Sequence, residues 1–179
     1  MMLNKARQIL QKFYGYEDFR PGQKKVVESL LNKNDTVAIM PTGAGKSICF
    51  QIPALLFEGV TLVISPLISL MKDQVNELNS SGISATTINS SMGNKEISDE
   101  LRKIRDNKIK LLYVSPERLL LDSFIELANS ITVPFLIIDE AHCISQWGHD
   151  FRRSYLDINT FIEKLANVAL EAKDDFAKG

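Results

Sequence analysis

The chain has 179 residues, of which 45% are hydrophobic and 24% are charged. These values are near the average for soluble globular domains, and they exclude a disordered tail, a collagen-like rod and a disulfide scaffold. Lysine and arginine number 21 and aspartate and glutamate 22, so the formal net charge of -1 gives no sign of bulk affinity for nucleic acid. Two cysteines are too few to cross-link a secreted fold, and no apolar run approaches the roughly 20 residues that span a membrane. We therefore expect a cytoplasmic protein.

The first 34 residues predict two helices, joined by an aromatic-rich turn at 14–23. Beyond them, short apolar runs bounded by Pro, Gly, Asp or Ser indicate buried strands at 36–40, 60–64, 111–114 and 135–138, with a weaker strand at 83–88. Apolar residues at helical spacing separate these runs at 67–78 and 97–104.

After the last run we expect a loop at 141–153, an apolar-faced helix over 156–165 and a charged tail at 167–179. Residues 1–166 then form one α/β domain. Because strands alternate with helices, the sheet is predicted to be mostly parallel, with helices on both faces.

Residues 40–47 read Met-Pro-Thr-Gly-Ala-Gly-Lys-Ser and lie between a predicted strand and a predicted helix. This order is typical of a phosphate-binding loop, in which backbone N–H groups and a helix N-terminus surround the phosphates. Lys46 would reach the β- and γ-phosphates, and Ser47 would coordinate Mg²⁺. Met40 replaces the first glycine of the usual pattern, and the alternative interpretation is a glycine-rich turn that caps a helix. The predicted nucleotide contacts of the loop are Thr42, Gly43, Ala44, Gly45, Lys46 and Ser47.

An acidic pair follows the apolar run at 135–138, where Asp139 and Glu140 come at the carboxyl end of a predicted strand. Ligands bind at these ends in open parallel sheets. Asp139 would hold Mg²⁺, directly or through water, and Glu140 would orient and deprotonate the attacking water. Acids at strand ends also serve as helix caps, so the assignment depends on the phosphate loop.

Two other patterns suggest sites that we do not favour. Residues 32–35 match the NKxD signature of guanine recognition, but they precede the phosphate loop and are better interpreted as a polar turn. His142, Cys143 and His149 could form a metal site, yet their spacing fits no common zinc pattern and no second cysteine pair completes it.

The acidic pair is part of the sequence Asp139-Glu140-Ala141-His142, a DEAH box. This box and the phosphate loop are two of several motifs that occur here in the order typical of one protein family. From about Tyr14 to Tyr155 the chain resembles the first motor domain of a RecQ-type DNA helicase of superfamily 2. The resemblance implies a three-layer RecA-like P-loop NTPase domain that uses ATP and Mg²⁺. It also implies single-stranded and forked DNA as partners, and a role in DNA repair and recombination.

The turn at 14–23 is similar to the adenine-recognition motif of this family. Tyr16 and Arg20 can sandwich a flat base, and the amide of Gln23 can pair with the donor and acceptor edge of adenine. The alternative is a helix–helix turn with a packed aromatic residue, which is the role we expect for Phe19.

DNA contacts are implied by three further segments. Residues 65–74 and 113–119 resemble motifs on the DNA side of the family, and residues 143–152 resemble an aromatic-rich loop that couples DNA binding to ATP hydrolysis. Aromatic side chains in such a loop suit base stacking, which contributes about 1 to 3 kcal/mol per base. The predicted DNA-binding or coupling residues are Ser65, Lys72, Arg118, Trp147, His149, Phe151 and Arg152.

The chain also departs from the family pattern. Ala44 stands where the family commonly has Gly, and Arg153 where it usually has Pro. The next expected strand, with its Thr-Ala-Thr or Ser-Ala-Thr motif, and the second motor domain with its arginine finger are absent from this sequence. An arginine finger contributes about 10³ to 10⁵ in rate, so we expect nucleotide binding with very slow hydrolysis. A nucleotide- or DNA-binding module without turnover and a P-loop kinase are the alternatives.

Overall fold

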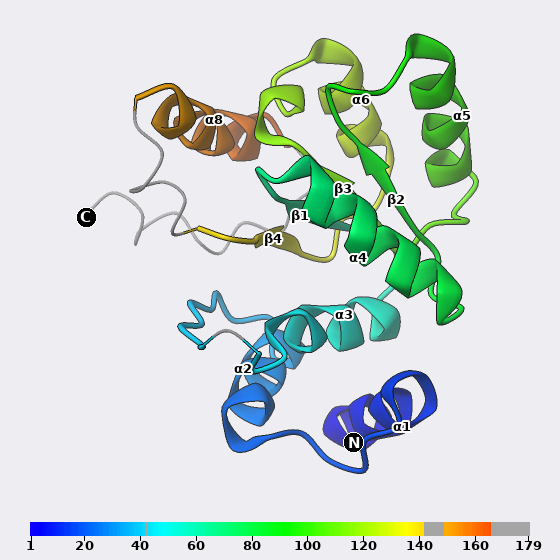
Figure 1. Cartoon of the computed structure of the whole chain (residues 1–179), viewed down its shortest axis with the longest axis vertical. Coiled ribbons are helices and arrows are strands. Elements are labelled where there is room, and N and C mark those ends of the chain that lie inside the picture. The colour runs from blue at the N-terminus through cyan, green and yellow to red at the C-terminus, as the bar shows by residue number, and fades with distance from the viewer. Residues whose placement is uncertain (42, 142–148, 166–179) are drawn as a thin grey trace. The chain divides into compact units, whose positions relative to one another are not determined.

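The computed structural model describes residues 1–41, 43–141 and 149–165, and for residues 149–156 it describes only the backbone (Figure 1). The described residues fall into two compact units, which meet in the sequence between Phe57 and Glu58. We call residues 1–57 the helical unit and the described residues from 58 onwards the sheet unit. Among the described residues, no helix is both long and apolar enough to cross a membrane.

The helical unit consists of α1 (Met2–Tyr14), α2 (Pro21–Leu31) and α3 (Lys46–Leu56). Helix α1 is capped by Gly15, which has a left-handed conformation (φ 74°) and donates its N–H to the carbonyl of Gln11. Helix α2 begins at Pro21, inside the segment predicted as a turn, because proline is favoured at the first helical position. The three helices share a core of Ala6, Leu10, Phe19, Val27, Cys49 and Ile52, so Phe19 packs as expected.

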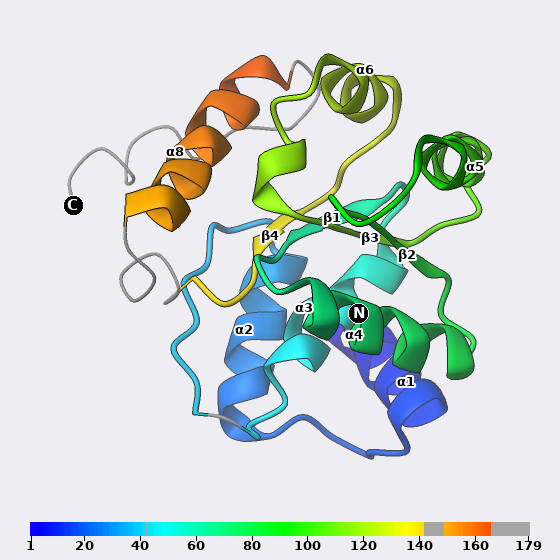
Figure 2. The same cartoon turned by 45° about the horizontal axis from the view of Figure 1, so that its top comes forward.

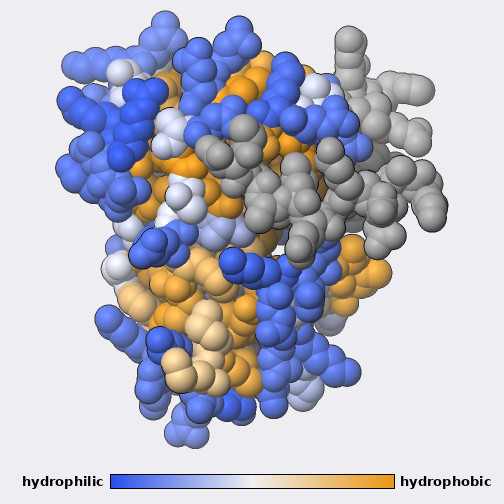
Figure 3. All heavy atoms as spheres, turned by 180° about the vertical axis from the view of Figure 1, so that it is seen from behind, coloured by the Kyte–Doolittle hydropathy of each residue, from blue (hydrophilic) through white to orange (hydrophobic). Residues whose placement is uncertain are grey.

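The strand predicted at 36–40 is absent from the structure, and that prediction is wrong. These residues have no strand pairing, and Val37 and Ile39 are 88% and 96% exposed. The apolar run looks like those of the true strands, but a strand also needs a neighbour for its backbone hydrogen bonds, and none of the described residues provides one. Apolar surface is visible over much of the helical unit in the lower half of Figure 3.

The sheet unit is built on four parallel strands in the order β2-β3-β1-β4. Their bounds are β1 Thr61–Ile64, β2 Ala85–Ile88, β3 Leu111–Val114 and β4 Leu136–Ile138. All four lie within predicted apolar runs, and the parallel sheet is confirmed. The inner strands β1 and β3 are buried at every residue, whereas the edge strand β4 is half-buried throughout.

Helices cover both faces of this sheet, as Figure 2 shows for α4 on one side and α5, α6 and α8 on the other. Their bounds are α4 Ile68–Ser80, α5 Asn94–Arg105, α6 Asp122–Ser130 and α8 His149–Lys164, with a short 3₁₀ helix, η1, at Pro116–Arg118. Side chains of α5, α6 and α8 form one core with Leu62, Ile64, Leu112 and Val114 of the sheet. Within it the rings of Phe124 and Phe161 lie 5.7 Å apart, centroid to centroid. The sequence prediction had omitted α6.

The loop predicted at 141–153 is wrong over its last five residues, because α8 begins at His149. The apolar spacing that predicted this helix starts only at Leu156, so it gave no signal for the first two turns. His149, Phe151 and Arg152 are therefore helical residues, while Trp147 lies outside the described residues.

Candidate functional site

The predicted phosphate loop leads directly into α3, which begins at Lys46. Gly43 and Gly45 have φ angles of 78° and 75°, in the left-handed region that favours glycine, and the N–H of Ala44 bonds to the carbonyl of Pro41. Lys46 and Ser47 thus occupy the first turn of a helix, where unpaired backbone N–H groups and the helix dipole favour an anion. Thr42 lies outside the described residues.

Gln23 holds this loop from α2. Its Nε2 donates to the carbonyls of Ala44 and Gly45 at 3.0 and 3.2 Å, and its Oε1 accepts from the backbone N–H of Arg20 at 3.0 Å. The side chain is buried, and a Cβ at position 45 would collide with its amide nitrogen. Both amide donors therefore serve the loop, and pairing with adenine, which stays a prediction, requires the amide to exchange these partners.

The neighbouring residues of the turn are more open. The Arg20 guanidinium donates to the carbonyl of Gly43 at 3.2 Å, and Tyr16 is 53% exposed. The turn is tied back to α1 by an ion pair of 2.8 Å between Arg7 and Asp18. The hydrogen bond from Arg7 lowers the pKa of Asp18, and the same bond raises the pKa of Arg7. Stacking of a base between Tyr16 and Arg20 stays a prediction.

Cys49 lies one turn into α3, behind the loop. Its thiol is buried, 3.8 Å from the carbonyl oxygen of Gly45 and 3.9 Å from the sulfur of Met40. Burial raises its pKa to about 11. The thiol is therefore protonated at neutral pH and acts as packing rather than as a nucleophile.

Asp139 lies at the carboxyl end of β4, as predicted, and its N–H donates to the carbonyl of Ile64 on β1. One carboxylate oxygen, Oδ1, accepts the N–H of Glu140 at 3.0 Å. The other, Oδ2, lies 3.5 Å from Nε2 of Gln74 on α4. Glu140 adopts a left-handed φ of 52°, an uncommon conformation that is concentrated at functional sites.

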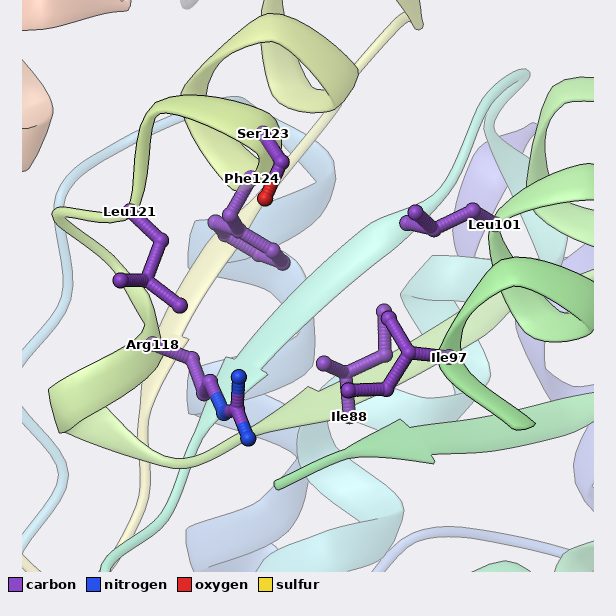
Figure 4. A pocket seen from close by; sticks show the side chains of 7 residues that line it. All are labelled: Ile88, Ile97, Leu101, Arg118, Leu121, Ser123 and Phe124. Carbon is purple, nitrogen blue, oxygen red and sulfur yellow. The ribbon is translucent and has the colours of Figure 1, made fainter. Parts of the chain in front are cut away.

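The predicted DNA contacts have different environments. Ser65 follows β1 and is only 1% exposed, so its hydroxyl cannot reach a DNA strand in this conformation, while Lys72 on α4 is exposed. Arg118 lies at a shallow hollow of the sheet unit (Figure 4). The other lining residues are mostly apolar: Ile88, Ile97, Leu101, Leu121, Ser123 and Phe124. DNA binding by these residues stays a prediction.

The two unfavoured alternatives differ in what the structure says of them, and the metal site stays untested because only the backbone of His149 is described. Residues 32–33 form a turn directly after α2, which agrees with the polar-turn interpretation of the NKxD pattern. Three potential metal ligands of the His, Cys, Asp or Glu type do not cluster anywhere in the described ranges. His142 and Cys143 lie outside those ranges.

The side chains present suit a magnesium-bound nucleotide by the chemistry of their donors. Ser47 and Asp139 supply hard oxygen atoms, the kind that Mg²⁺ prefers, and Gly43 and Gly45 carry no side chain that could block phosphates at their positions. Ser47 belongs to the helical unit and Asp139 to the sheet unit, and their convergence on one ligand stays a prediction.

Sequence reasoning missed two contacts of the candidate site. It assigned the Gln23 amide to adenine only, although the capping-box spacing of Arg20 and Gln23 indicates a local bond. It also passed over Gln74, whose contact with Asp139 joins residues 65 positions apart and leaves no local signal.

Comparisons with known proteins identify the family and the fold. A family model described as DEAD/DEAH box helicase matches residues 20–172. The ATP-dependent DNA helicase RecQ of Bacillus subtilis is 48% identical over 99% of this chain and 32% of its own length. The protein of the same name from Haemophilus influenzae is 47% identical over 96% of this chain and 28% of its own length. This chain therefore spans about a third of the length of these relatives.

A solved structure shows the same fold. The crystal structure of a hypothetical ATP-dependent RNA helicase from Sulfolobus tokodaii matches with a TM-score of 0.66 at 20% sequence identity. The match covers 92% of this chain and 47% of that one.

Proposed function

The chain belongs to the DEAD/DEAH box helicase family, and we propose that it is the first motor domain of an ATP-dependent DNA helicase that moves 3′ to 5′. The similarity to two RecQ DNA helicases over nearly the whole chain supports DNA as the substrate. Single-stranded and forked DNA, a second motor domain and a cytoplasmic location belong to the same proposal. Hydrolysis and unwinding require that second domain, because stepping depends on two domains that close around ATP.

The residues of the phosphate loop bind the nucleotide. ATP with Mg²⁺ supplies, when bound, the phosphoanhydride bond that is hydrolysed. Lys46 neutralises phosphate charge, Ser47 and Asp139 hold the metal, and Glu140 orients and deprotonates the attacking water. Tyr16, Arg20 and Gln23 select adenine, and the Gln23 amide exchanges the carbonyls of Ala44 and Gly45 for the base when nucleotide binds.

The DNA side of the site belongs to the carboxyl ends of β1 and β3. Lys72 on α4 and Arg118 on η1 bind the phosphate backbone without reading sequence. Trp147, together with His149, Phe151 and Arg152, couples DNA contact to the acidic pair. Base stacking and phosphate contacts confined to these residues allow DNA binding despite the net charge of -1.

One observation carries the nucleotide assignment: Gln23 and Arg20 hold a loop with two left-handed glycines at the start of α3. A glycine-rich turn that only caps a helix does not need a buried amide bonded to two successive loop carbonyls. The bonds stabilise the loop in a defined shape before ligand arrives, which lowers the entropy cost of binding phosphates.

The test is ATP hydrolysis by this chain, with and without single-stranded DNA, alone and after addition of a separately expressed second motor domain. We expect DNA-stimulated turnover in the mixture, lost in Lys46→Ala and in Glu140→Gln. DNA binding that is indifferent to ATP, with no turnover in any mixture, would identify a binding module instead. Phosphorylation of a small molecule would identify a kinase.

A further inference from the structure

Three polar residues follow three neighbouring strands of the sheet at the same level. Ser115 comes after β3, Ser65 after β1 and Asp139 after β4, and the strand register pairs Ile64 with both Val114 and Ile138. The residues that come next on each strand therefore form a row along the carboxyl edge. The order of this row is Ser115, Ser65, Asp139.

The pleat of the sheet directs this row towards α4. Side chains alternate between the two faces of a sheet. Ile64, Val114 and Ile138 belong to the core formed with α5, α6 and α8, so the next residue on each strand faces the opposite side. That side carries α4 (Figure 2).

Helix α4 reaches the row through Gln74. Its buried side chains Met71, Val75 and Leu78 recur at helical spacing, and Gln74 lies at the edge of this face. From there Nε2 of Gln74 approaches Oδ2 of Asp139 at 3.5 Å. This is a long hydrogen bond, and catalytic hydrogen bonds are often long until ligand is bound.

The polar groups here are only partly satisfied. Within the described part of the chain, Oγ of Ser65, Oγ of Ser115 and Oε1 of Gln74 are buried and have no hydrogen-bond partner. Leaving a buried polar atom unpaired costs about 1 to 3 kcal/mol, so a protein rarely keeps three such atoms without a use. The free Oε1 leaves the Gln74 amide without a hydrogen-bonded anchor other than Asp139 in this part of the chain, and Oγ of Ser65 is the free oxygen next to Asp139 in the row.

We propose that Gln74 is a positioning residue, which orients the Asp139 carboxylate for the metal and connects it to α4. The inference rests on the proposed function, since Asp139 is the metal-holding residue there. Groups hydrogen-bonded to a metal ligand fix its orientation, and their loss costs about 10- to 100-fold in metal affinity. Because Lys72 lies on the same helix, a shift of α4 on DNA contact moves the Gln74 amide and with it the carboxylate.

The experiment measures binding of a fluorescent, non-hydrolysable ATP analogue to the 179-residue chain across a titration of Mg²⁺. Gln74→Met keeps the length of the side chain but removes the amide. We expect it to raise the half-saturating Mg²⁺ concentration by about tenfold, with affinity for the analogue unchanged at saturating Mg²⁺. Asn76→Met, at an exposed amide of the same helix, is the matched control and should not shift the titration.

A double-mutant cycle separates positioning from a structural role. In an Asp139→Asn background, Gln74→Met should have no further effect on the Mg²⁺ dependence, because the group through which it acts is gone. Gln74→Asn, whose amide is one methylene too short to reach Asp139, should also shift the Mg²⁺ titration. If Gln74→Met does not fold, Gln74→Asn tests the positioning role in its place.

The outcomes that contradict the inference are distinct. A wild-type chain that binds the analogue in a Mg²⁺-dependent way, with Gln74→Met titrating identically, overturns the positioning role and leaves the proposed function intact. Equal loss of affinity at every Mg²⁺ concentration means that Gln74 is merely structural. A wild-type chain that binds no analogue at any Mg²⁺ concentration overturns the proposed function, and the positioning role with it.

Discussion

The tightest structural requirement in the phosphate loop is at Gly45, and it can be tested against its neighbour Gly43. Both glycines have φ near 75° to 78°, but a Cβ at position 43 would meet nothing within 4 Å, whereas a Cβ at position 45 would collide with the amide of Gln23. Replacement by alanine in the left-handed region costs about 1 to 2 kcal/mol, partly offset by the lower entropy of the unfolded chain. Gly43→Ala should therefore cost about 1 kcal/mol.

Gly45→Ala should cost more, because the displaced amide also loses its bonds to the carbonyls of Ala44 and Gly45. At about 1 kcal/mol for each bond, the total is about 3 kcal/mol. Urea denaturation followed by far-ultraviolet circular dichroism measures both values. In a Gln23→Ala background the amide is absent, and the two alanine substitutions should then cost the same. Equal losses for Gly43→Ala and Gly45→Ala in the otherwise unchanged chain would refute the reasoning.

Three further predictions follow from the contacts described above. Gln23→Ala should weaken ATP binding more than GTP binding, measured by calorimetry; equal losses would remove the adenine assignment. Burial raises the pKa of Cys49 from 9.0 to about 11, so the folded chain keeps the thiol proton to a higher pH than the unfolded chain does. The free energy of unfolding should therefore be unaffected by this group below the unfolded pKa and fall as the pH rises from 9 to 11. A Cys49→Ala chain lacks this component, and an identical pH slope in both chains would argue against it. Phe161→Ala, at a fully buried ring packed on Phe124, should destabilise the sheet unit by about 3 to 5 kcal/mol in the same denaturation assay; a loss below about 1 kcal/mol would mean that α8 does not contribute to the core.

Particular segments show how far the sequence predicts this fold. The runs at 60–64 and 111–114 were correctly identified as strands, because continuous apolar residues bounded by turn formers are typical of strands buried on both faces. The run at 36–40 is also mostly apolar and is not a strand. The difference is not in the residues themselves, since pairing depends on a neighbouring strand.

The candidate site shows the same division. The residue types of the phosphate loop and the acidic pair at 139–140 are apparent from local order alone, because glycines, a lysine and strand-end acids each have a short-range signature. The hydrogen-bond partners of the Gln23 and Gln74 amides are not apparent from local order. Gln23 bonds across 21 and 22 positions to loop carbonyls, and Gln74 reaches Asp139 across 65.

By itself, then, the sequence predicted the four strands of the sheet, the glycine-rich loop before α3 and the place of the acids after β4. Tertiary structure decided which apolar run pairs, where α8 begins and which groups the two amides hold. The physical reason is range: backbone propensity and apolar periodicity act over a few residues, whereas a hydrogen-bond partner or a neighbouring strand is chosen only when distant segments pack together.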